Sequence, residues 1–326
     1  MNIYVLMNEF LTLGNSDLKI SRVGFGSWAI GGEWEWGWGP QQDSDSIRAL
    51  HHAFDSGVNW VDTAPVYGLG HSEKVVGRAL RESGADVYIF TKCGFRWNDA
   101  KEITPNLTAK SIREEVEASL DRLGREVIDL YQIHWPNPEG QIEEAAETLF
   151  ELKSEGKIRW VGVSNFSVNH FERIKEIGDV VSLQPEYSMI SRDVEAEVLP
   201  YCARHGIGCI AYSPMGSGML SGKMTRERIS KMSFGDWRKQ AAFTQEPQLS
   251  KNLELVDRLR TLSADVSCSI GALAVSWIFR KKCLKGAILG MRNVDQVALA
   301  SEVIEMTLSE ELLSQIHSCL SESART

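Results

Sequence analysis

Three consecutive segments decide the expected fold: residues 23–30 read VGFGSWAI, residues 43–55 read DSDSIRALHHAFD, and residues 59–64 read NWVDTA. The first and third are short apolar runs, which are typical of strands buried on both faces of a parallel sheet. The second segment places Ile47, Leu50 and Phe54 on one face of a helix. The order strand, helix, strand therefore predicts a parallel α/β unit.

The same alternation continues along the 326-residue chain, with further strands expected at residues 87–93, 128–134, 158–164, 180–184, 208–213 and 286–290. Helices are expected between them, for example over 142–155 and over 108–123, where the Thr108 hydroxyl can cap the first turn. Eight βα units fit a closed barrel, whereas about six would indicate an open doubly wound sheet. Because no linker or change of composition interrupts the pattern, residues 1–326 are predicted to form one domain of the α/β class, a (β/α)8 TIM barrel. Residues 216–250 are too long for a plain connection, and we expect them to be functional or to contain a small helix.

Composition narrows the partners and the compartment. The net charge of −9 disfavours nucleic acid as the main partner, because phosphate binding needs a basic face. We find no signal peptide in residues 1–13 and no apolar stretch of membrane-spanning length, so we expect a cytoplasmic protein without a membrane partner. The six cysteines form no CxxC motif and are expected to be reduced thiols that mainly pack.

Four chemically active side chains lie at or just after the ends of three consecutive predicted strands: Asp62, Tyr67, Lys92 and His134. Alone, each has a commoner structural explanation: a cap, a packing ring, a surface charge or a buried core histidine. Together they lie where a barrel places its catalytic groups, at the carboxyl ends of the strands. The sequence therefore predicts an active site built from an acid, a phenol, an amine and an imidazole.

The segments that carry these residues resemble those of the aldo-keto reductase family, in particular the bacterial general-stress or aldehyde-reducing members with a short C-terminus. The resemblance runs from residue 13 to about residue 313 and rests on VDTAPVYGLGHSE (61–73), IFTKCG (89–94), DLYQIHWP (129–136), GKIRWVGVSNFS (156–167), LQPEYSM (183–189), AYSPMGSGMLSGK (211–223) and AILGMRNVDQV (287–297). It implies hydride transfer between a nicotinamide and a carbonyl carbon, with NADP(H) bound at the carboxyl ends of the strands.

By this resemblance Tyr67 is the proton donor and His134 orients the carbonyl oxygen. A phenol is a weak acid at neutral pH unless its phenolate is stabilised, and a nearby ammonium provides that stabilisation. Lys92 is the expected ammonium, and Asp62 would hold it in place and protonated. This chemistry needs no metal, and the sequence suggests no metal site.

The cofactor site is expected to differ from a Rossmann fold, because no GxGxxG motif opens a βαβ unit near the start. The resemblance implies instead an extended cofactor across the barrel mouth. Tyr212 would stack on the nicotinamide, Ser164, Asn165 and Gln184 would bind its carboxamide, and residues 213–217 would wrap the pyrophosphate with backbone N–H groups. The complete expected cofactor set is Ser27, Trp28, Asp62, Ser164, Asn165, Gln184, Tyr212, Ser213, Pro214, Met215, Gly216, Ser217, Lys223, Arg238, Gly290, Met291, Arg292 and Gln296.

Three basic residues of this set, Lys223, Arg238 and Arg292, are expected to bind a 2′-phosphate, since a guanidinium pairs well with phosphate; the structural alternative is that they are solvated surface charges. They favour NADPH over NADH. Gln296 and Ala300 depart from the family pattern, in which many members carry Arg and Asn at these positions. The first departure removes a charge and the second a hydrogen-bonding group, so both weaken the expected preference.

Tryptophan is dense after the first predicted strand, at Trp28, Trp34, Trp36 and Trp38. Apolar walls with few polar groups are typical of small-ligand pockets. The expected substrate pocket consists of Trp28, Trp34, Trp36, Trp97 and Trp135, and it favours aryl or medium-length aliphatic aldehydes. The alternative for the loop tryptophans is that they only pack a glycine-rich segment.

Two other functions are compatible with parts of this pattern. An NADPH-binding redox sensor, resembling the channel-associated β subunits, would carry the same four residues, although the chain has no long N-terminal extension of the inactivation type. A metal-dependent barrel hydrolase would need histidine and carboxylate ligands at several strand ends, where only Asp62 and His134 are found. The sequence thus favours an NADP-dependent carbonyl reductase that acts on a small molecule as a monomer or weak homo-oligomer.

Overall fold

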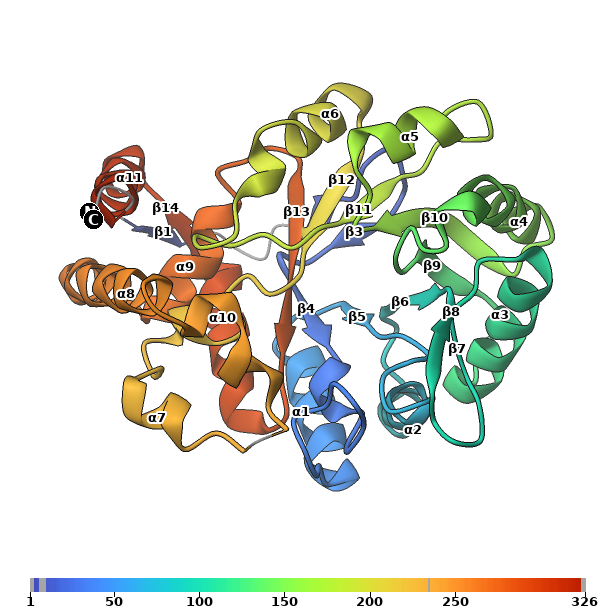
Figure 1. Ribbon diagram of the computed structural model, residues 1–326, viewed down its shortest axis with the longest axis horizontal. Coiled ribbons are helices and arrows are strands. Elements are labelled where there is room, and N and C mark those ends of the chain that lie inside the picture. Colours follow the sequence, from blue (N-terminus) through green and yellow to red (C-terminus); the bar gives the residue numbers. More distant parts are fainter. Residues whose placement is uncertain (1–2, 6–9, 234, 324–326) are drawn as a thin grey trace.

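The computed structural model describes residues 3–5, 10–233 and 235–323, and its centre is a closed barrel of parallel strands (Figure 1). Around the barrel the strands follow the order β10-β11-β12-β13-β4-β5-β6-β9, with every neighbouring pair parallel. Their bounds are β4 (Val23–Gly26), β5 (Trp60–Asp62), β6 (Tyr88–Cys93), β9 (Ile128–Ile133), β10 (Ile158–Ser164), β11 (Ser182–Gln184), β12 (Gly208–Ala211) and β13 (Leu284–Gly290). The predicted (β/α)8 TIM barrel is confirmed.

A ring of helices covers the barrel (Figure 1). Those that complete the eight βα units are α1 (Asp43–Asp55), α2 (His71–Ser83), α3 (Ala109–Leu123), α4 (Ile142–Ser154), α5 (Val168–Ile174), α6 (Val198–His205), α9 (Ile270–Ile278) and α10 (Val297–Glu305). The predicted cap is present, because the Thr108 side chain accepts a hydrogen bond from Ser111 N.

Additional elements decorate the barrel. Helices α7 (Arg226–Ser230) and α8 (Gln248–Asp265) lie between β12 and α9, and α11 (Glu310–Ser323) packs on α8. The small ribbons pair β1 (Ile3–Val5) with β14 (Met306–Leu308), β2 (Leu11–Thr12) with β3 (Lys19–Ile20), and β7 (Phe95–Trp97) with β8 (Ile103–Pro105). The 3-10 turns used below are η1 (Trp28–Ile30), η4 (Met219–Ser221), η5 (Trp237–Gln240), η6 (Ala242–Thr244) and η7 (Val294–Gln296).

The first strand is shorter than expected. We predicted a strand over residues 23–30, but β4 ends at Gly26 and η1 follows. Ser27 has φ −96° and ψ 5°, outside the strand region, and its carbonyl accepts a hydrogen bond from Ile30 N. The chain therefore turns out of the barrel wall at Ser27 and carries Trp28 onto the rim.

Packing in the barrel interior explains why residues 24 and 286 are glycines, without a nucleotide-binding motif. A Cβ at Gly24 would lie 2.3 Å from the indole of Trp60, and one at Gly286 would lie 2.7 Å from the same ring. Trp60 is fully buried and packs on Phe90 with ring centroids 5.1 Å apart. These glycines therefore make room for a core tryptophan.

The segment 216–250 contains the small helix α7 and three 3-10 turns, as its length suggested. Four of the six cysteines are buried, namely Cys93, Cys202, Cys209 and Cys283. Within the described residues, no single helix is both long and apolar enough to cross a membrane; α8 and α9 pass that test only as a pair, which is bent by 97°.

Candidate active site

A buried ion pair lies at the carboxyl ends of β5 and β6. Lys92 is fully buried, and its ammonium donates hydrogen bonds to Asp62 Oδ1 at 2.7 Å and to the Thr63 carbonyl at 2.9 Å. The same ammonium lies 3.3 Å from the hydroxyl oxygen of Tyr67. Since β5 and β6 are adjacent parallel strands, their ends bring these residues together.

The charges of this group largely cancel. Burial raises the pKa of Tyr67 well above its usual value, and the negative charge of Asp62 raises it further. Burial lowers the pKa of Lys92, while Asp62 opposes that shift. The acidifying effect of Lys92 on the phenol stays a prediction, and burial and Asp62 both act against it. The phenol therefore holds its proton at neutral pH.

His134 directly follows β9, the strand adjacent to β6. Its ring contacts Tyr67 edge-on with centroids 5.7 Å apart, and Phe95 with centroids 5.2 Å apart. Burial lowers the pKa of His134 well below its usual value, and the positive charge of Lys92 adds to the effect. The imidazole is therefore neutral at physiological pH and has one N–H to donate.

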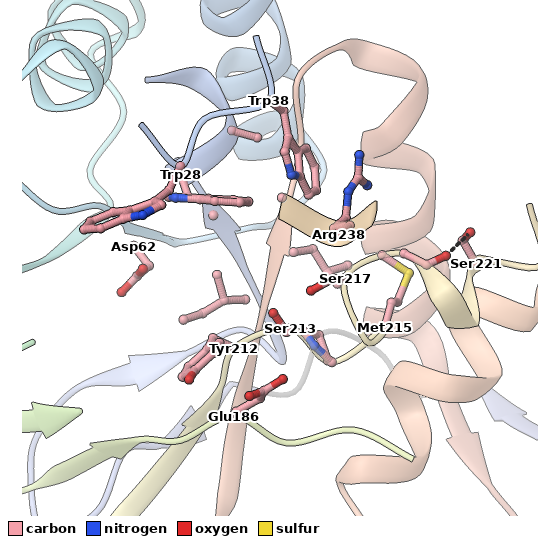
Figure 2. A pocket seen from close by; sticks show the side chains of 18 of the residues that line it. Trp28, Trp38, Asp62, Glu186, Tyr212, Ser213, Met215, Ser217, Ser221 and Arg238 are labelled. Carbon is pink, nitrogen blue, oxygen red and sulfur yellow. Dashed lines mark hydrogen bonds between the residues drawn. The ribbon is translucent and has the colours of Figure 1, made fainter. Parts of the chain in front are cut away.

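A cavity of about 1300 Å³ opens beside these residues and is large for a small-ligand pocket, which typically measures about 300–1000 Å³. Asp62, Tyr67 and His134 are among its lining residues (Figure 2 shows Asp62). Residues of α9 and α10 also line it, among them Gly271 and Leu299. A cavity lined both by residues after the barrel strands and by outer helices suits an extended ligand that reaches across the barrel mouth.

The polar residues expected to hold a carboxamide form one connected network. Gln184 Nε2 donates to Asp62 Oδ2 at 2.7 Å, and Ser164 Oγ donates to the Gln184 carbonyl at 2.8 Å. Asn165 Nδ2 donates to Ser164 Oγ at 3.0 Å, and the Tyr212 hydroxyl donates to Asn165 Oδ1 at 3.0 Å. The ion pair and the predicted cofactor residues are thus linked through Gln184.

The chain after Tyr212 forms a tight turn on the cavity wall (Figure 2). Ser213, Gly216, Ser217 and Gly218 have positive φ values of 50°, 54°, 52° and 96°. Turns that include left-handed residues direct backbone N–H groups into anion-binding concavities. This segment is therefore suited to a pyrophosphate, and its role in cofactor binding stays a prediction.

Aromatic rings form the wall above the turn. Trp28 packs edge-on against Trp38 at 5.1 Å and against Trp237 of η5 at 6.5 Å between centroids. Trp34 lies nearest to the predicted proton donor, with its centroid 6.1 Å from that of Tyr67. The guanidinium of Arg238 stacks over the Trp38 ring at 4.5 Å (Figure 2). The loop after β4 and the segment 216–247 therefore meet over the cavity.

Most predicted site residues line this cavity, and a few do not. Lys92 lies buried behind Asp62 and Tyr67. Trp97 lies farther along the β7–β8 ribbon, while Phe95 at the base of that ribbon lines the cavity instead. The predicted residues absent from its lining are Lys92, Ser27, Gly216, Met291, Arg292 and Trp97.

Two of the three basic residues expected at the 2′-phosphate already have partners within the protein. Arg292 donates to Gln41 Oε1 at 2.8 Å and to the Pro40 carbonyl at 2.7 Å, so it anchors the loop after β4. Arg238 lines the cavity but is ion-paired with Asp236 at 2.6 Å. Lys223 lines the cavity as expected.

The sequence analysis missed several cavity residues. Trp237, Phe243 and Arg228 come from the long segment 216–250, in which the sequence analysis singles out only Gly216, Ser217, Lys223 and Arg238. Its aromatic and basic composition was the available signal. Glu186, which also lines the cavity, lies inside the quoted LQPEYSM segment, and its charge between apolar neighbours could have drawn attention to it.

Comparison with known proteins agrees with this geometry. Residues 22–321 match the model of the aldo/keto reductase family. The chain belongs to this family. As an aldo/keto reductase, it is an oxidoreductase that uses a nicotinamide cofactor and acts on small carbonyl compounds.

Two curated relatives cover nearly the whole aldo/keto reductase chain. It is 36% identical over 315 residues to aldo-keto reductase YhdN of Bacillus subtilis, with 96% of this chain and 93% of that protein covered. It is 35% identical to an NADH-specific methylglyoxal reductase of Escherichia coli, with 92% and 94% covered. Because the second relative is NADH-specific, family membership alone leaves the choice between NADH and NADPH open.

The solved structures support the same fold for this aldo/keto reductase. A glycerol dehydrogenase from Gluconobacter oxydans superposes with a TM-score of 0.90 at 35% identity, covering 98% of both chains. An aldo-keto reductase from Bacillus halodurans in its holo form gives a TM-score of 0.81 at 26% identity, covering 96% of both chains.

Proposed function

We propose that this protein reduces small aldehydes and ketones to alcohols with NADPH, using Tyr67 as the proton donor. The observation that carries the proposal is the 3.3 Å distance between the Lys92 ammonium and the hydroxyl oxygen of Tyr67, a residue that lines the cavity. A carbonyl that becomes an alkoxide needs a proton at its oxygen, and a phenol on the cavity wall can deliver one.

The residues present fit a nicotinamide cofactor. Tyr212 offers an aromatic face, Gln184 and Asn165 offer amide groups beside it, and the turn after Tyr212 suits a pyrophosphate. When bound, the reduced cofactor supplies a hydride to the carbonyl carbon.

Four side chains of the protein would deliver the proton and stabilise the charges that its transfer creates. Tyr67 is protonated at neutral pH and gives its proton to the substrate oxygen as negative charge develops there. The Lys92 ammonium beside the phenol oxygen stabilises the phenolate that remains, and Asp62 keeps that ammonium oriented. Neutral His134 donates a hydrogen bond that holds the substrate oxygen next to Tyr67.

A moderate preference for NADPH is part of the proposal. Lys223, Arg228 and Arg238 bring positive charge to the same cavity, and charged hydrogen bonds to a 2′-phosphate contribute about 1.5–3 kcal/mol each. The ion pair of Arg238 with Asp236 reduces that gain, because the guanidinium already has a counter-charge.

The aromatic rings of the cavity wall favour neutral, compact substrates.

The experiment that tests the proposed function is a steady-state assay of NADPH oxidation with methylglyoxal, glyceraldehyde, benzaldehyde and a ketone. We expect turnover with at least one aldehyde, at kcat values typical of enzymes, about 1 s⁻¹ or more. Tight NADPH binding without turnover of any carbonyl would contradict the proposal and favour a redox sensor.

A further inference from the structure

Glu186 is a carboxylate on the cavity wall that the proposed mechanism does not use. It lies two residues after Gln184, just beyond the end of β11. Among the described residues, its side chain has no hydrogen bond or ion pair with any other group. The Glu186 side chain is exposed to solvent on the cavity wall. Partial desolvation there raises the pKa of Glu186, and the negative charge of Asp193 adds to that effect. A positive charge placed beside this carboxylate would therefore be stabilised.

Strand register places this carboxylate next to Tyr212. Glu186 and Tyr212 form a parallel β-bridge, and bridged residues on adjacent strands point to the same face. Both side chains line the cavity, and Figure 2 shows them as neighbours. Because Tyr212 is the ring proposed to stack on the nicotinamide, Glu186 lies beside the position of the reacting ring.

The other cavity carboxylates differ from Glu186. Asp62 is paired with Lys92, and Glu302 accepts hydrogen bonds from the Ser269 amide and hydroxyl at 2.6 and 2.7 Å. Asp295 lies in the first turn of η7, after β13. Glu186 is therefore the one acid of these four that lacks a partner and stands beside Tyr212.

We infer that Glu186 selects the redox state of the bound cofactor by stabilising the positive charge of the oxidised nicotinamide. The inference rests on the proposed function. When the hydride, a proton with two electrons, passes to the carbonyl carbon and Tyr67 protonates the oxygen, the ring is left with one positive charge. The carboxylate attracts that charge and has no such attraction for the neutral reduced ring. It thus favours hydride departure towards the substrate.

The test compares equilibrium binding of NADP⁺ and NADPH, measured by calorimetric titration of the purified protein. For Glu186→Gln we expect the ratio of Kd for NADP⁺ to Kd for NADPH to rise on the order of tenfold, because an attraction between unit charges in a partly solvated cavity is lost. Glu186→Asp keeps the charge and should stay within about threefold of the wild-type ratio. Asp295→Asn removes one negative charge from the same cavity away from Tyr212, so it should leave the ratio unchanged.

Two outcomes would overturn the inference while leaving the proposed function in place. The first is an equal change of both dissociation constants in Glu186→Gln. The second is an unchanged ratio with an altered KM for the carbonyl, which would assign the carboxylate to the substrate. A wild-type protein that binds neither cofactor would instead overturn the proposed function, and the inference with it.

Discussion

The fully buried ammonium of Lys92 lies 3.3 Å from the hydroxyl oxygen of Tyr67. A buried ammonium must be paired, and Asp62 provides the partner at 2.7 Å. The Lys92 ammonium therefore has two neighbours. Asp62 is its permanent counter-ion, whereas the Tyr67 side chain needs the positive charge only when the phenol is deprotonated. The value of this charge for catalysis is therefore largest in the transition state.

Lys92→Met should lower the rate of aldehyde reduction by about 10²-fold or more, because the Tyr67 phenolate loses its cationic neighbour. The variant also leaves Asp62 buried and without its partner, so we expect a loss of stability of about 3–5 kcal/mol. Combining Lys92→Met with Tyr67→Phe should cost little more activity than either change alone, since both act on one proton transfer. Single-turnover NADPH oxidation and urea unfolding measure the two effects. Multiplicative losses in the double variant would show that the residues act independently.

Cofactor preference should depend on Arg238 more than on Arg292. Arg238 lines the cavity, whereas Arg292 is held by Gln41 and Pro40. Arg238→Ala should weaken NADPH binding by about tenfold and NADH binding much less, since a charged contact contributes about 1.5–3 kcal/mol. Arg292→Ala is the matched control, and it should change NADPH binding less than Arg238→Ala does. If wild-type protein bound both cofactors equally, the proposed NADPH preference would be wrong.

Substrate choice should depend on Trp34, whose ring centroid lies 6.1 Å from that of Tyr67. Trp34→Ala should change the ratios of kcat/KM across a panel of aryl and aliphatic aldehydes by about tenfold, because a pocket contact of this kind is worth about 1–3 kcal/mol. Trp97→Ala serves as the control, because Trp97 does not line the cavity. Unchanged ratios in the Trp34 variant would mean that the tryptophans only pack the loop.

Stability should depend on pH through Glu115 in α3. Burial raises the pKa of this carboxyl to about 7, against hydrogen bonds from Gly94 N and Ser111 that lower it. Because the folded pKa exceeds the ordinary value, Glu115 contributes stability at low pH that is lost as the pH rises from about 4.5 through 7. The loss should amount to roughly 3 kcal/mol. Urea unfolding at several pH values should show a smaller decline in Glu115→Gln, and identical pH profiles would refute the assignment.

Much of the fold could be predicted because its signals are local and repeated. Helix α1 begins and ends at Asp43 and Asp55, as the apolar spacing indicated, and the strand ends correctly located Asp62 and His134. The end of β4 was missed because Ser27 turns the chain through a hydrogen bond rather than through glycine or proline. The partners of Arg292 and Arg238 depend on loops that meet only in three dimensions, so no local pattern shows them. Trp237 reaches the cavity from a segment more than 200 residues after Trp28, and the aromatic and basic composition of that segment was its only local signal.

The most direct measurement is single-turnover NADPH oxidation by Tyr67→Phe at saturating cofactor. The change keeps the ring and removes only the hydroxyl beside Lys92, so folding and NADPH affinity should stay close to wild type. General acid catalysis typically contributes about 10²- to 10⁴-fold, and aldehyde reduction should fall by at least the lower figure. A variant that retained near wild-type rates would contradict the account and leave His134 as the proton donor to test.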